Sequence, residues 1–286
     1  MQHSIWKTMW KEICRDPLAI IGLAVFVATV ATVYIWALFI PLEAMDGVFH
    51  LRLAPPDWAA GVPLGYDNIG RNVLHYLIIG ARNSFNIAFM VTGGAVTIGM
   101  LFGLLAGYYG GFIDYILMRI LDFFTMIPSL IIIIIVAALF NFTVVSFSVM
   151  MLLLSWPATA RLMRSMTLRQ GSLEYVSASK TLGTPNIVIL FREVLPNLVS
   201  IITANLTITL AMNIGIETGL TMLGFGLARD VPSLGRLIEF GRTAYNMQNR
   251  LWLWVPAALM VVIMMLCVNF VGQALNRAAD AKKRRA

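Results

Sequence analysis

Charged residues are scarce in this sequence. Only 12% of its 286 residues are Asp, Glu, Lys or Arg, whereas 59% are hydrophobic. Soluble domains average about 25% charged residues. A soluble fold of this size cannot hide so much apolar surface, so the composition predicts that lipid is the solvent. The charges lie between apolar blocks rather than on one basic face, so the net charge of +7 does not indicate nucleic-acid binding.

Several chemical motifs are also absent. Cys14 precedes the first apolar block and Cys267 lies inside the last one, so no disulfide is expected. The three histidines show no metal-ligand spacing. The dipeptide Gly-Lys does not occur, so there is no phosphate-binding G-x-x-x-x-G-K-[ST] loop and the chain cannot itself be the ATPase. We expect no catalytic residue, no metal and no cofactor on this chain.

Six apolar segments are each long enough to cross a bilayer, which takes about 20 residues. Their ranges are 18–40, 84–107, 123–140, 143–160, 198–223 and 254–276. Runs of this length do not alternate as the strands of a barrel do. The sequence therefore predicts an all-α integral membrane protein with about six transmembrane helices, the first of them too long to be a signal peptide.

Lys and Arg residues are unevenly divided between the connections. With the N-terminus inside, 14 of them lie in the inner segments and seven in the outer loops. Lys and Arg are enriched on the cytoplasmic side of membrane proteins. The bias predicts a multi-pass protein with both termini in the cytoplasm.

The connections suggest four regions. We expect a lead and first span over 1–60, an external segment over 61–83, a membrane core over 84–276 and a basic tail over 277–286.

The connection at 161–197 is the longest one predicted to face the cytoplasm within the core. Its pattern predicts two short helices. The first covers 172–182, with Ser172 as its N-cap and Gly183 after its end, and the second starts at Pro185. A connection that folds in this way is suited to dock on a partner, whereas a surface hairpin without a partner is the simpler alternative.

Glycines recur at a spacing of four residues in two predicted spans. They are Gly99, Gly103 and Gly107 in one span and Gly215 and Gly219 in another. Glycines at this spacing line one face of a helix and let a neighbouring helix approach closely. The pattern predicts tight helix packing at all five positions.

Glu217 is the only ionisable residue well inside a predicted span. A carboxyl group in a membrane is costly and is by default a hypothesis for a functional site. Two roles are open, contact with a substrate path and a structural role with Thr218 or Thr221 as hydrogen-bond partners. The flanking glycines favour the structural role.

The 161–197 segment resembles the cytoplasmic signature of permeases of bacterial and archaeal ATP-binding-cassette (ABC) importers. That signature reads Glu-Ala-Ala, three residues, Gly, nine residues, Ile, one residue, Leu-Pro. The matching residues are Ala178, Gly183, Leu195 and Pro196, and the departures are Ser177, Ser179 and Glu193. The peptide group's form of this stretch, EYVEAARALG…RHILPN, also matches at Glu174, Tyr175, Val176 and Arg192.

Three further stretches resemble the same group. Residues 63–85, PLGYDNIGRNVLHYLIIGARNSF, resemble PLGTDxxGRDVLxRLIxGARxSL, with Tyr66 and Asn72 as departures. Residues 217–226, ETGLTMLGFG, resemble EAxLSFLGLG, and residues 107–129 also fit. The resemblance covers nearly the whole chain. It identifies the chain as similar to the second, C-type, permease subunit of the dipeptide, oligopeptide and nickel group.

The resemblance implies a type I ABC importer transmembrane fold in a bacterial or archaeal cell membrane. The implied partners are a second permease, two ATP-binding subunits that hold ATP and Mg, an extracytoplasmic binding protein and the lipid bilayer. The coupling loop to the ATP-binding subunits would include Glu174, Ala178, Leu182, Gly183, Arg192, Leu195 and Pro196. The solute would be a peptide or a related small solute such as nickel. An ion-coupled secondary transporter or channel is the main alternative, and an intramembrane enzyme is a second.

Overall fold

The structure is a computed structural model that describes residue 10, residues 13–41 and residues 45–283, with side chains as far as Arg277. Most of the predicted basic tail therefore lies outside the described side chains. The long helices are α2 (Pro17–Ala37), α3 (Val73–Tyr109), α4 (Gly111–Thr125), α5 (Ser129–Leu139), α6 (Val144–Gly171), α9 (Leu195–Leu223) and α12 (Val255–Lys283). The short elements are η2 (Phe49–Leu51), α7 (Glu174–Thr181), α8 (Asn186–Ile189), the π-helical turn η3 (Leu190–Val194), α10 (Leu234–Glu239), η4 (Phe240–Arg242), α11 (Ala244–Asn249) and η5 (Leu251–Leu253).

The number of spans agrees with the sequence. Five helices are long and apolar enough to cross a membrane, and α4 with α5 makes a sixth if that bent pair is one span. The prediction of about six transmembrane helices in an all-α protein is confirmed.

The third span is broken rather than straight, which corrects the prediction of one helix over 123–140. α4 and α5 meet at an angle of 58°. The break falls at 126–128, where Pro128 is the N-cap of α5. Proline has no backbone N–H to donate to the preceding turn, so the helix cannot pass through this position unchanged.

Two other helices begin or end outside their predicted bounds. α3 starts at Val73, because the Asn72 side chain accepts a hydrogen bond from the Leu74 backbone N–H at 2.9 Å and caps the helix there. The predicted boundary between an external segment 61–83 and a core from 84 therefore falls inside a helix. α6 continues to Gly171, well beyond the predicted end at 160.

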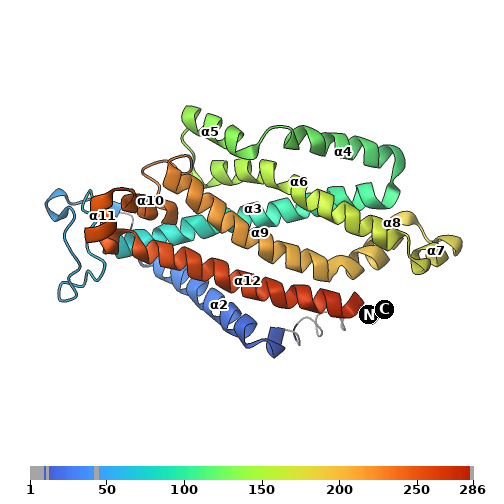
Figure 1. Ribbon diagram of the computed structural model, residues 1–286, viewed down its shortest axis with the longest axis horizontal. Coiled ribbons are helices and arrows are strands. Elements are labelled where there is room, and N and C mark those ends of the chain that lie inside the picture. Colours follow the sequence, from blue (N-terminus) through green and yellow to red (C-terminus); the bar gives the residue numbers. More distant parts are fainter. Residues whose placement is uncertain (1–9, 11–12, 42–44, 284–286) are drawn as a thin grey trace.

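The helices lie roughly side by side in one elongated bundle (Figure 1). α2 and α12 lie on one side, α4 and α5 on the opposite side, and α3, α6 and α9 between them. One end of the bundle carries α7 and α8 together with the start of α2 and the end of α12, and we call it the hairpin end. The other end carries the 45–72 loop, α10 and α11, and we call it the loop end (Figure 1).

The α3 glycines lie where α3 crosses α6. A Cβ atom added at Gly99 would lie 2.7 Å from Thr159 Cβ, and one added at Gly107 would lie 2.6 Å from the carbonyl oxygen of Arg164. An added Cβ at Gly103 would meet the backbone of α6 at 2.6 Å. The absence of side chains thus lets the two helix backbones touch, as predicted for these three positions.

The second pair of glycines does not behave in this way. An added Cβ at Gly215 would reach only the flexible end of Met265, at 3.0 Å. Gly219 has no described atom within 4 Å of such a position, so it packs against no described residue of this chain, and a packing role there stays a prediction. The α9 glycines that stand four apart do not both face a neighbouring helix.

The glycine contact leads to a test by substitution. Gly103→Val should destabilise the solubilised protein by about 1–3 kcal/mol, because overpacking at a backbone contact forces the helices apart. Gly93→Val is the matched control on the same helix, because Gly93 has open space around it. The measurement is the midpoint of thermal unfolding of both variants. A Gly103→Val protein as stable as the parent would contradict the packing described here.

Candidate functional site

The α6-to-α9 connection folds into a helical hairpin, residues 172–194, at the hairpin end of the bundle (Figure 1). α6 leads into its first arm, α7. The second arm is continuous with the next span, because α8, η3 and α9 form one helix over Asn186–Leu223. Ser172 is not the N-cap that was predicted, since α6 extends to Gly171 and Leu173 precedes α7 without a side-chain cap. The second arm is thus a direct extension of a transmembrane helix.

A left-handed glycine makes the turn of the hairpin. Gly183 has φ +80°, a conformation that costs glycine little and other residues more. The backbone N–H of Gly183 donates to the Lys180 carbonyl at 3.0 Å, and the N–H of Thr184 donates to the Ser179 carbonyl at 3.1 Å. These bonds satisfy carbonyls at the end of α7. The prediction that Gly183 ends the first helix is confirmed.

Two departures from the importer signature contact each other. The Ser179 hydroxyl on α7 lies 2.9 and 2.8 Å from the two carboxylate oxygens of Glu193 on η3, and donates to them. A hydrogen bond to a charged acceptor is among the stronger kinds in proteins. Ser179 and Glu193 therefore replace small and apolar signature residues with a polar clamp between the arms of the hairpin.

Tyrosines hold the hairpin to the bundle. Tyr108, near the end of α3, donates its hydroxyl hydrogen to Asn186 Oδ1 at 3.0 Å. Tyr175 on α7 donates to Gln170 Oε1 at 3.1 Å. Burial raises the pKa of the Tyr175 hydroxyl, so this group keeps the proton that it donates.

An apolar cluster lies beneath these hydrogen bonds. Its buried members are Leu104, Val176, Ile189, Leu190, Val194 and Leu198. They come from α3, α7, the second arm and the start of α9, so the inner face of the hairpin is packed against two spans. The hairpin is therefore anchored on one face and free on the other.

The free face of the hairpin is partly apolar. Leu182 beside the turn is 85% exposed. Other large apolar residues are exposed on the same hairpin, namely Leu173, Ile187 and Phe191. Exposed apolar groups at the tip of a hairpin, with charged neighbours, are typical of a protein contact surface.

The structure separates the predicted coupling residues into two sets. Five of them are exposed on the hairpin: Glu174, Ala178, Leu182, Gly183 and Arg192. Leu195 and Pro196 instead begin α9, where they are half-buried and form the base of the second arm.

Glu217 lies in a different place, toward the loop end of α9. It is fully buried and accepts hydrogen bonds from Thr221 Oγ1 at 3.1 Å and from Thr218 Oγ1 at 3.3 Å. Ser84 of α3 adds a third hydroxyl contact. Among the described residues its hydrogen-bond partners are all neutral hydroxyls, so the environment is that of a structural hydrogen-bonded group.

Several residues at this junction were not predicted. The Ser84 hydroxyl oxygen also accepts a hydrogen bond from the Leu234 backbone N–H, at 3.3 Å, and Asn83 Nδ2 donates to the Pro232 carbonyl at 2.9 Å. An added Cβ at Gly80 would lie 2.9 Å from the Ser233 backbone. Only the polar residues Asn83 and Ser84 inside an apolar span could have indicated these contacts in the sequence.

Among the described residues no group of three or more His, Cys, Asp or Glu is placed to hold a metal ion.

Comparison with known proteins agrees with this architecture. The family described as "Binding-protein-dependent transport system inner membrane component" matches residues 99–285. The oligopeptide transport system permease protein OppC of Lactococcus lactis subsp. cremoris (strain SK11) is 39% identical over 281 residues, which cover 98% of this chain and 96% of that protein. The dipeptide transport system permease protein DppC of Haemophilus influenzae is 30% identical over 278 residues, covering 96% of this chain and 93% of that protein.

The helical membrane bundle, the hairpin that joins two of its spans and the family match together place the chain in the class of transport permeases. The chain belongs to the family of binding-protein-dependent transport system inner membrane components, as a permease of the peptide group of ABC importers. In these transporters separate subunits hydrolyse ATP, so this chain is not an enzyme.

The surroundings of Glu217 lead to a test of its role. Glu217→Gln should keep most of the transport activity, because hydroxyl groups can both donate to and accept from an amide. Glu217→Leu should lower the yield of assembled complex, since it leaves buried hydroxyls unsatisfied at a cost of about 1–3 kcal/mol. Yield and transport are measured for both variants. If Gln is as damaging as Leu while the complex still assembles, the charge itself is needed.

Proposed function

We propose that this chain forms half of the translocation path of an ATP-driven peptide importer. The second half is another permease, two ATP-binding subunits hold ATP and Mg, and an extracytoplasmic binding protein delivers the solute. The choice of peptides is supported by the relatives, which include oligopeptide and dipeptide transport permeases. Nickel or another small solute is the alternative within the same group.

The hairpin is the surface that docks on the ATP-binding subunits. The observation that carries this proposal is the combination of an anchored inner face with an exposed, partly apolar tip. Because the hairpin leads from α6 and continues into α9, a partner that moves it also moves the spans. ATP binding and hydrolysis in the partner would in this way drive alternating access of the path.

The proposed orientation places the hairpin and both termini in the cytoplasm. The distribution of Lys and Arg supports it. The start of α2 and the end of α12 lie at the same end of the bundle as α7, which supports this orientation (Figure 1).

Thiol labelling tests the orientation. In a background with Cys14→Ser and Cys267→Ala, an impermeant thiol reagent added to intact cells should label Ala60→Cys, in the exposed 45–72 loop. It should not label Ser172→Cys, which is also exposed in the structure. Permeabilised cells serve as the control in which both positions should react. Labelling of Ser172→Cys alone in intact cells would reverse the topology.

A substitution at the turn tests the docking surface. Gly183 has open space around it, so a tryptophan there has nothing within the chain to clash with. Gly183→Ala should be destabilised only by the left-handed backbone, by about 1–2 kcal/mol. Gly183→Trp should be destabilised by the same amount, and it also adds a bulky side chain to the docking face. Capture of the ATP-binding subunits should therefore fall at least tenfold for Trp and little for Ala.

Gly224→Trp is the matched control at the loop end. It also has a left-handed backbone, with φ +91°, and open space around it. This variant should capture the ATP-binding subunits as the parent does. The docking proposal fails if Gly183→Trp inserts, binds the ATP-binding subunits and transports at the parent level.

A further inference from the structure

Charged side chains connect α4 to α6 in two groups of different kind. Arg164 on α6 holds both carboxylate oxygens of Asp114 on α4, with Nη2 at 2.5 Å from Oδ2. Both side chains of this pair are mostly covered. This first group is a neutralised, bidentate clamp between the helices.

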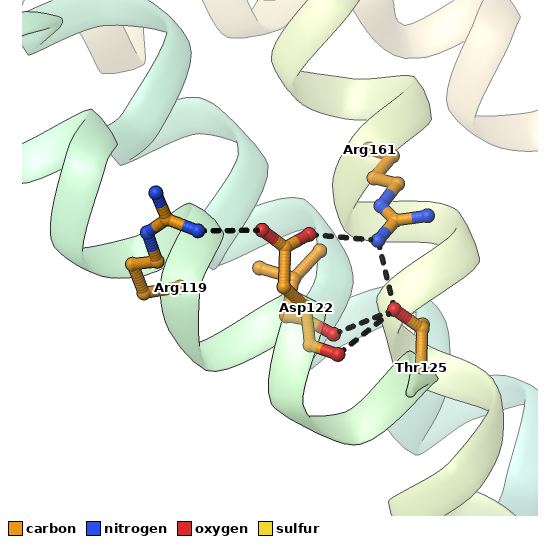
Figure 2. A network of polar contacts seen from close by, with 5 residues as sticks. Arg119, Asp122, Thr125 and Arg161 are labelled. Atoms are coloured by element: carbon orange, nitrogen blue, oxygen red, sulfur yellow. Dashed lines mark hydrogen bonds and ion pairs between the residues drawn. The ribbon is translucent and has the colours of Figure 1, made fainter. Parts of the chain in front are cut away.

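The second group is open to the surroundings. Arg161 Nη2 on α6 lies 3.1 Å from Asp122 Oδ1 on α4, and Arg119 Nη1 lies 3.9 Å from Asp122 Oδ2 (Figure 2). Arg161 Nη2 also donates to Thr125 Oγ1 at 2.8 Å. The side chains of Arg119, Asp122 and Arg161 are 68%, 51% and 50% exposed. We call these three residues the charge patch, in which two guanidinium groups share one carboxylate.

The charge patch lies near the edge of the membrane on the side of the hairpin. Arg161 is 17 residues beyond Val144, the first residue of α6. At 1.5 Å per residue this is about 26 Å along the helix, so Arg161 lies close to the far edge of a hydrocarbon layer that is roughly 30 Å thick. Charged side chains within membrane segments almost always face the interior of a bundle or a water-filled cavity, and long ones near the end of a span reach toward the water at the interface. Lipid chains are therefore not the expected neighbour of this face.

The helix break beside the charge patch supports the same conclusion. The irregular segment 126–128 directly follows Thr125, and both Met126 and Ile127 are exposed. Non-helical backbone at membrane depth is tolerated only where protein covers it or where it lines a water-filled cavity. By contrast, α2 and residues 255–276 on the opposite side carry no charged residue, as suits a face toward lipid.

We propose that the charge patch lines the water-filled path and transiently binds the charged ends of a zwitterionic solute. Arg119 and Arg161 attract a carboxylate, and Asp122 attracts an ammonium group. The inference rests on the proposed function as an importer and adds a site in this chain. Weak binding suits such a site, because a solute in transit has to leave again.

A phosphate group of a lipid shares the oxyanion chemistry of a carboxylate. The mixed sign of the charge patch favours the solute, because the Asp122 carboxylate repels a phosphate but attracts the ammonium end of a peptide. The two sources make different predictions, so one experiment can distinguish them.

Protection from labelling is the first test. The assembled importer carries Arg119→Cys in the background with Cys14→Ser and Cys267→Ala, and sits in lipid nanodiscs. A charged, water-soluble methanethiosulfonate should modify this cysteine, and trialanine with binding protein and ATP should slow the modification at least threefold. Leu259→Cys, exposed on α12, is the lipid-facing control and should not react. Mass spectrometry of this chain measures both rates.

Three results would overturn the proposal. They are no reaction at Arg119→Cys, a rate that trialanine does not change, and a rate that follows the anionic lipid content instead. Uptake of trialanine by the parent importer is measured first. If that uptake fails, the proposed function fails and not the site.

Charge selection is the second test. Uptake of trialanine is compared with uptake of its C-terminal carboxamide, and the ratio is taken for each variant so that the preference of the binding protein cancels. Arg161→Gln should lower this ratio about threefold to fivefold, as expected for the loss of one exposed charge contact. Arg169→Gln removes a charge from the same helix outside the charge patch and should leave the ratio unchanged. An unchanged ratio in Arg161→Gln would contradict the proposed binding of the carboxylate.

Discussion

The close approach of α3 to α6 is the contact on which the other features of this structure depend. Side chains are missing from α3 at Gly99, Gly103 and Gly107, so the backbone of α6 lies directly against it. Membrane helices gain little from burying apolar surface against one another, because lipid is equally apolar, and they depend on such close contacts instead. The contact fixes the position of α6, and α6 in turn carries Arg161 and Arg164 toward α4. It also places the ends of α3 and α6 beside the hairpin, where Tyr108 and Gln170 hold it.

A hairpin that leads directly into a span can transmit a displacement. The second arm runs into α9 without a loop, and the polar clamp of Ser179 and Glu193 ties it to the first arm. The π-helical turn η3 lies between α8 and α9 in the second arm, and it contains Glu193. Turns of this kind interrupt the regular helix and occur often at functional sites. The hairpin thus combines two fixed arms with one place where the helix geometry is not regular.

The features set by local chemistry could be predicted from the sequence. Long apolar runs specified the spans, and the glycine after α7 specified the turn at Gly183. The break at Pro128 was harder to predict, because a proline between apolar residues is compatible with a kinked or a broken span. The prediction that Ser172 is the N-cap of α7 was wrong, because α6 continues past its expected end and Ser172 is the C-cap of α6.

Contacts between residues on different helices could not be predicted from the sequence pattern. Gly219 has the spacing of a packing glycine, but the face of α9 on which it lies meets no other described helix. Glu217 could be recognised as unusual, yet its contact with Ser84 depends on how α3 and α9 are placed side by side. The charge patch likewise joins residues of two helices, and only one of its two ion pairs, Arg119 with Asp122, has a helical spacing that the sequence displays.

The helix that contains α9 connects the two ends of the molecule. It is 38 residues long from Asn186 to Leu223, which corresponds to about 57 Å at 1.5 Å per residue. Along its length it is tied to α3 by the hydrogen bond from Asn213 Nδ2 to Thr92 Oγ1, at 2.9 Å. At the loop end its buried Glu217 contacts Ser84, which in turn accepts a hydrogen bond from the start of α10.

This arrangement supports the predicted structural role of the buried carboxyl group, which requires no contact with the solute. When α9 is displaced at the hairpin end, it can move the loop end only if it is bound to its neighbours at the loop end. Without such contacts α9 would move and its neighbours would stay in place. Apolar packing alone would let α9 slide against α3, whereas the hydroxyl groups around Glu217 have directional hydrogen bonds that fix one register. Burying the carboxyl group is unfavourable, but its hydrogen bonds hold α9, α3 and α10 in one defined arrangement. In the proposed mechanism, coupling across the membrane would depend on that connection as much as on the hairpin, because a displacement that begins at the hairpin end has to reach the loop end.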